Sequence, residues 1–208
     1  MQPVRHTFLP SERRFDDAVR AQYSGLLQQN RDYMAAAQKV DATELARINT
    51  PESFADPDTA TEARRLLHVS YDLDATQEKK VAERVANIRH ILEESAWSAS
   101  ERQAYLSGFD STMAQVTPKR QQLLSAEKVW IDSVDELYNY ASEHHGSIKV
   151  SNGRVAIADG SILQQFNVMI ETEESRRNEL LRAKQEFNQL QSNTMEKMGV
   201  SQKELGVQ

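Results

Sequence analysis

The histidines and acidic residues are the first candidates for catalysis, because helical metal centres take their ligands from them. Helical di-iron proteins use Glu-x-x-His pairs that project into the core. None of the five histidines has Asp or Glu three residues before it, and His-Glu-x-x-His is absent as well. The chain has no cysteine, which removes disulfides, thiol catalysis and cysteine-ligated metals. The sequence therefore predicts no metal site and no cofactor.

Serine-based catalysis and phosphate binding also lack a motif. The Gly-x-Ser-x-Gly nucleophile elbow is absent, and there is no Gly-rich phosphate loop. Serines stand instead at the expected starts of helices, where a hydroxyl caps the first turn. We therefore predict no catalytic or cofactor-binding residue, and we expect that the protein is not an enzyme.

The strongest β signal lies at residues 147–158, where we predict a hairpin. Asn152-Gly153 favours a type I′ turn, because both central residues of that turn need a positive φ. Strand side chains alternate between faces. The turn therefore predicts two apolar cross-strand pairs on one face: Val150 with Val155, and Ile148 with Ile157.

The opposite face of this hairpin is the most distinctive polar surface of the sequence. It carries Lys149 and Arg154, and the preceding helix ends close by with His144 and His145. We predict these four residues as a contact surface for a protein partner. The alternative is a structural role, since a cationic histidine in the last turn of a helix interacts favourably with the helix dipole.

Apolar residues at three- and four-residue steps predict four long helices, at about 11–48, 58–97, 100–145 and 161–198. Only seven Gly and five Pro remain for loops, and short connections make neighbouring helices antiparallel. The predicted fold class is all-α: an elongated, coiled-coil-like antiparallel four-helix bundle, with the hairpin between helices 3 and 4. We expect a single domain over 1–200 and a disordered tail at 201–208.

Local signals refine the helix boundaries. Pro118 falls inside the third helix, but the apolar pattern stays in phase across it, so we predict a kink rather than an end. Residues 51–54 are expected to form a single turn in the first loop. Capping boxes are predicted at the starts of the third and fourth helices: Ser98 with Glu101 or Ser100 with Gln103, and Ser161 with Gln164.

Composition limits the classes of partner. The net charge is −6 over 208 residues, and the mean hydropathy is −0.66, so we expect no nucleic-acid partner. Runs of charged residues, such as Arg176-Arg177, are expected on solvated helix faces. Opposite charges one turn apart, such as Glu173 and Arg177, are expected to add only a few tenths of a kcal/mol each. No run of about 18 apolar residues occurs, so we predict no membrane span. The first ten residues lack an apolar signal region. We therefore expect a cytoplasmic protein, or an envelope protein whose export signal or anchor has been removed.

Six aromatic residues gather in the second and third predicted helices. At helical spacing such residues usually belong to the core, and the alternative is a ligand pocket between helices. They are Trp97, Trp130, Tyr105, Phe109, Tyr138 and Tyr140.

One segment, Trp130–Ile170, resembles uncharacterised bacterial envelope proteins that include small lipoproteins. In those proteins a long helix ends in a short hairpin and a capped helix follows. The matching residues are Ile148, Val150, Asn152, Gly153, Val155, Ile157, Ser161, Phe166, Asn167, Met169 and Ile170. The resemblance implies a helical fold and an envelope location. We expect a non-enzymatic structural or protein-interaction module, the soluble part of such a protein; the alternative is a small-ligand sensor or carrier.

Overall fold

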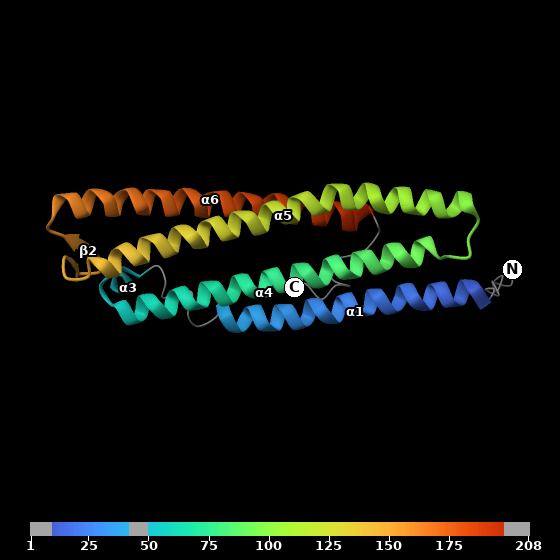
Figure 1. Ribbon diagram of the computed structural model, residues 1–208, viewed down its shortest axis with the longest axis horizontal. Helices are drawn as coiled ribbons and strands as arrows, with labels where there is room; N and C mark the ends of the chain where they lie inside the picture. The colour runs from blue at the N-terminus through green and yellow to red at the C-terminus, as the bar shows by residue number, and fades with distance from the viewer. Residues whose placement is uncertain (1–9, 42–49, 198–208) are drawn as a thin grey trace. The chain divides into compact units, whose positions relative to one another are not determined.

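The computed structural model describes residues 10–41 and 50–197, and these are mostly helical (Figure 1). A two-stranded antiparallel sheet stands between the last two helices. The helices are α1 (Pro10–Asp41), α3 (Pro51–Ala55), α4 (Pro57–Glu93), α5 (Ala99–Glu143) and α6 (Gly160–Lys197), and the strands are β1 (Ile148–Ser151) and β2 (Arg154–Ile157). The four predicted long helices correspond to α1, α4, α5 and α6. Residues 42–48 of the first predicted helix and the predicted tail lie outside the described residues.

The helix count is corrected from four to five within the described residues, so the predicted four-helix bundle is not confirmed. The expected single turn in the first loop is a separate helix, α3, with Pro51 at its start, where the missing N–H costs nothing. Ser53 is fully buried. Its hydroxyl donates to the Thr50 carbonyl at 2.7 Å and is hydrogen-bonded to the Tyr138 hydroxyl at 2.8 Å. These buried contacts with α5 fix a segment that is too short to be stable alone.

Two boundary predictions are confirmed and one is corrected. Pro118 lies inside a continuous α5 and does not end it, while the kink expected there stays a prediction. Ser98 and Glu101 form the capping box, with reciprocal backbone-to-side-chain bonds of 3.0 and 3.3 Å. The start of α6 is capped by Asp159 rather than by Ser161, because the Asp159 carboxylate accepts the backbone N–H groups of Ser161 and Ile162 at 2.8 and 3.1 Å. The Ser161 hydroxyl also donates to this carboxylate, and these bonds lower the pKa of Asp159.

The hairpin has the predicted register. Val150 pairs with Val155 and Ile148 pairs with Ile157. The two turn residues adopt positive φ angles, 54° at Asn152 and 67° at Gly153, as a type I′ turn requires. Ile148 is only 2% exposed, so the apolar face of the hairpin belongs to the core.

The chain divides into two compact units, each described by itself. Unit 1 takes its described residues from Met1–Tyr33 and Thr76–Gln115, and unit 2 from Met34–Ala75 and Val116–Gln208. The single domain predicted over 1–200 stays a prediction.

Unit 1 is held by polar and aromatic contacts between α1, α4 and α5. Arg84 donates to the Gln29 side chain at 2.6 Å, and Gln29 donates to Gln77 at 3.1 Å. The Trp97 ring lies 4.2 Å from Phe15 and 4.3 Å from Tyr105, between ring centroids. The predicted helix 58–97 ends early, at Glu93, where the Ser95 hydroxyl donates to the Leu92 carbonyl at 2.8 Å.

Unit 2 holds two apolar clusters between α4, α5, α6 and the hairpin. The first contains Leu67, Ile131, Val134 and Tyr138. The second contains Leu137, Ala141, Ile148 and Phe166. Phe54 of α3 packs against both, and its ring lies 5.0 Å from Tyr138 and 5.4 Å from Phe166, between centroids. The short helix therefore joins the hairpin to the α4–α5 core.

Candidate functional site

The hairpin end of unit 2 contains all four residues predicted as a contact surface. Lys149 and Arg154 are exposed. Lys149 pairs with Ala156 and Ser151 with Arg154, so the two cations are diagonal neighbours on the outward face, within reach of each other's long side chains. The opposite face is fixed by the core. The structure therefore brings these two cations together on a firmly held ribbon.

The two histidines differ in their surroundings. The His144 ring lies 4.4 Å from the Tyr140 ring and is half-buried, while His145 is exposed and its Nδ1 lies 3.0 Å from the Ser142 carbonyl. Both histidines follow Glu143, the last residue of α5, which ends two residues before the predicted end. The chain turns after Glu143, and the Ser147 N–H donates to the His144 carbonyl at 2.8 Å. His144 thus has a packing role, and His145 is the one open to solvent.

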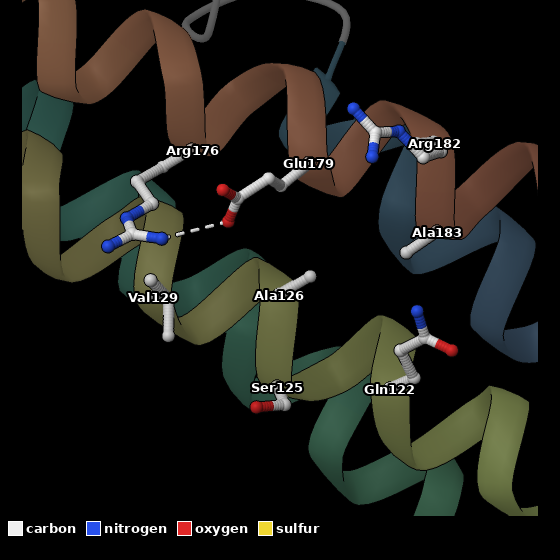
Figure 2. A pocket seen from close by; sticks show the side chains of 8 residues that line it. All are labelled: Gln122, Ser125, Ala126, Val129, Arg176, Glu179, Arg182 and Ala183. Carbon is white, nitrogen blue, oxygen red and sulfur yellow. Dashed lines mark hydrogen bonds and ion pairs between the residues drawn. The ribbon is translucent and has the colours of Figure 1, made fainter.

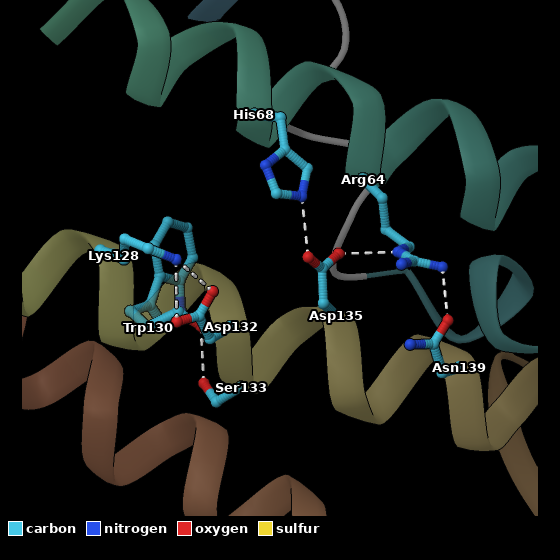
Figure 3. A network of polar contacts seen from close by, with 8 residues as sticks. All are labelled: Arg64, His68, Lys128, Trp130, Asp132, Ser133, Asp135 and Asn139. Atoms are coloured by element: carbon cyan, nitrogen blue, oxygen red, sulfur yellow. Dashed lines mark hydrogen bonds and ion pairs between the residues drawn. The ribbon is translucent and has the colours of Figure 1, made fainter. Parts of the chain in front are cut away.

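A second polar group joins α4 to α5 and was not anticipated from the sequence (Figure 3). Asp135 accepts from Arg64 Nε at 2.7 Å through one oxygen and lies 2.7 Å from His68 Nε2 through the other. Arg64 also donates to Asn139 at 2.6 Å. Arg64 and His68 are four residues apart, as are Asp135 and Asn139, so each pair occupies one helix face. That matched spacing is the signal that sequence reasoning missed.

Glu173 is a buried charge that the sequence did not indicate. It is 6% exposed, not solvated, and it accepts the indole N–H of Trp130 at 2.8 Å. Arg177 lies 3.4 Å from its other oxygen. A buried carboxylate needs such donors, because an unpaired charge away from water is costly. The helical spacing of Glu173 and Arg177 could not reveal that Trp130 of another helix contacts Glu173.

Two carboxyl groups meet between α4 and α5. Glu127 is hydrogen-bonded to Asp74 through its side chain, and Lys184 of α6 interacts with it electrostatically. Burial, the charge of Asp74 and this hydrogen bond raise the pKa of Glu127 to about 8, while Lys184 acts in the opposite direction. Since two carboxylates repel each other, a hydrogen bond between them needs one shared proton. The raised pKa of Glu127 lets this side chain supply the donor of that hydrogen bond.

A shallow recess of about 390 Å³ lies along the outer side of α5 and α6 (Figure 2). Small and polar side chains line it, and on the α6 side Arg176 donates to Glu179, one turn away on the same helix, at 2.9 Å. The lining residues are Gln122, Ser125, Ala126 and Val129 of α5, and Arg176, Glu179, Arg182 and Ala183 of α6. The recess is open to solvent, in contrast to the buried polar contacts of Glu173.

The described residues include no cluster of three or more His, Asp or Glu side chains placed to hold a metal ion. Within the same ranges, no helix combines the length and the apolar character needed to cross a membrane. The chain matches no protein-family model, and searches of curated proteins and of solved structures likewise find no match.

Proposed function

We propose that the protein is a non-enzymatic structural or protein-interaction module of a bacterial envelope protein, built on long antiparallel helices. The observation that carries the proposal is the hairpin end. Its apolar face is anchored in the core through Ile148, while Lys149 and Arg154 extend from the other face into solvent. A rigidly held surface loses little conformational entropy when a partner binds.

The polar side chains elsewhere in unit 2 support the same proposal. Asp135 is occupied on both oxygens by partners from α4, and Glu173 is occupied by Trp130 and Arg177. These side chains connect helices, and each supplies the hydrogen-bond or ion-pair partner that the other needs. The envelope location rests on the resemblance of the segment Trp130–Ile170.

Affinity capture with matched charge variants tests the proposal. The chain carrying Lys149→Glu and Arg154→Glu is expected to lose proteins that the wild type retains, because two cations become anions at the contact. A control with Lys79→Glu and Lys80→Glu makes the same charge change at exposed positions of α4 and is expected to retain them. Equal recovery by all three proteins would place the contact elsewhere. A small molecule that co-purifies with the chain would favour the alternative function, a ligand sensor or carrier.

A further inference from the structure

The two compact units differ in the character of their buried side chains. Every buried apolar side chain among the described residues belongs to unit 2. The buried side chains described in unit 1 are both polar: Gln29 is 9% exposed and Ser95 is 6% exposed. Burial of apolar surface is the dominant favourable term in folding. Unit 1 therefore gains less stability from its interior than unit 2 does.

Polar side chains also form the contact between α1 and α4 in unit 1. Phe15, Gln22 and Gln29 are seven residues apart, the spacing that keeps side chains along one contact line between packed helices, and two of the three are amides. Arg84 of α4 donates to Gln29 at 2.6 Å and more weakly to Gln22 at 3.5 Å, and Gln29 donates to Gln77 at 3.1 Å. A half-buried guanidinium held by neutral amides gains less than one paired with a carboxylate.

Gly25 lies between the two glutamines and makes room for Arg84. A Cβ atom at Gly25 would lie 2.4 Å from Arg84 Nη1, so the guanidinium lies directly against the backbone of α1. Inside a helix, glycine is less favourable than alanine because its backbone loses more entropy on folding. Gly25 stands near the middle of α1 (Pro10–Asp41). It therefore accommodates Arg84 and at the same time weakens the helix that Arg84 holds.

We propose that residues 10–33 of α1 are a strap that detaches from α4 and α5 while unit 2 stays folded. A segment held by polar contacts opens at a lower free energy than one that packs in an apolar core. Release of the strap separates the Phe15 ring from the Trp97 ring, which lie 4.2 Å apart between centroids, and returns Arg84 to water. The hairpin end belongs to unit 2, so this opening is independent of the proposed function.

Hydrogen exchange followed by mass spectrometry measures this opening segment by segment. In the wild-type chain, amides of residues 18–33 are expected to exchange about a hundredfold faster, relative to their intrinsic rates, than those of residues 131–141 in the core of unit 2. Arg84→Ala should speed exchange in residues 18–33 about tenfold further, because Gln29 loses its donor, and should leave residues 131–141 unchanged. Lys80→Ala removes an exposed cation from the same helix and should change neither segment.

A tightening variant tests the same contact in the opposite direction. Gln22→Leu, Gln29→Leu and Arg84→Leu together replace the polar layer with apolar side chains and should slow exchange in residues 18–33 about tenfold or more. A gain in protection of this kind cannot come from misfolding. The proposal is overturned if residues 18–33 and 131–141 of the wild type exchange alike, if Arg84→Ala speeds exchange equally in both segments, or if the tightening variant does not slow it.

Discussion

Replacing Glu127 by Gln should remove a pH dependence from the stability of unit 2. The unfolded side chain has a pKa of 4.5, and the folded side chain has one of about 8. Between these values the folded state holds a proton that the unfolded state has lost, so the free energy of unfolding falls as the pH rises from 4.5 to about 8. This decrease in the free energy of unfolding is complete above about pH 8 and absent below pH 4.5.

The size of the effect follows from the same interval. A tenfold change in proton affinity is worth about 1.4 kcal/mol, so the interval from 4.5 to about 8 sets an upper limit of about 5 kcal/mol. Glu127 is only partly buried, and water that reaches it screens the charge of Asp74, so we expect about 2 kcal/mol. The amide that Glu127→Gln introduces stays neutral at every pH and keeps a donor for Asp74.

Urea unfolding, followed by circular dichroism from below pH 4.5 to above pH 8, measures this difference. The variant should match the wild type at the acidic end and exceed it by about 2 kcal/mol at the alkaline end. Glu171→Gln, at an exposed position of α6, should run parallel to the wild type at every pH. Parallel curves for Glu127→Gln and the wild type would refute the reasoning.

Three further predictions concern the hairpin, the buried carboxylate and metal content. Changing Val155 and Ile157 to Ser should lower the free energy of unfolding by about 2–3 kcal/mol, because both side chains pack on the core; an unchanged thermal midpoint would contradict this. Trp130→Phe should lower the free energy of unfolding by about 1–3 kcal/mol, because Glu173 loses a buried hydrogen-bond donor. Urea titration measures this change, and a decrease below a few tenths of a kcal/mol would contradict the prediction. Untagged, dialysed protein should hold no stoichiometric transition metal by elemental analysis, and a retained metal would contradict the expectation that the protein has no metal site and is not an enzyme.

Local sequence signals predicted the local structure well. The Asn152-Gly153 turn determines the hairpin register, since a one-residue slip would turn Ile148 away from the core. The apolar phase on either side of Pro118 predicted a continuous α5 correctly. These features depend on residues close together in the chain, which is where pattern reasoning is strongest.

Contacts between distant residues could not be predicted in the same way. α3 depends on the bond between Ser53 and Tyr138, which are 85 residues apart. The cap of α6 is Asp159, whereas Ser161 was predicted from the sequence. Both residue types cap helices, so the local pattern alone did not decide between the two positions. The burial of Glu173 depends on Trp130 of another helix, and no spacing rule on α6 contains that information.

Site-specific photo-crosslinking in cells tests the central claim, that the hairpin end of the protein is a contact surface. A photoreactive amino acid would replace Lys149 or Arg154, and Lys79 or Lys80 as controls on α4. The account predicts discrete crosslinked products from the two hairpin positions and none from the two controls. Products of equal yield from all four positions, or products from the controls alone, would contradict it.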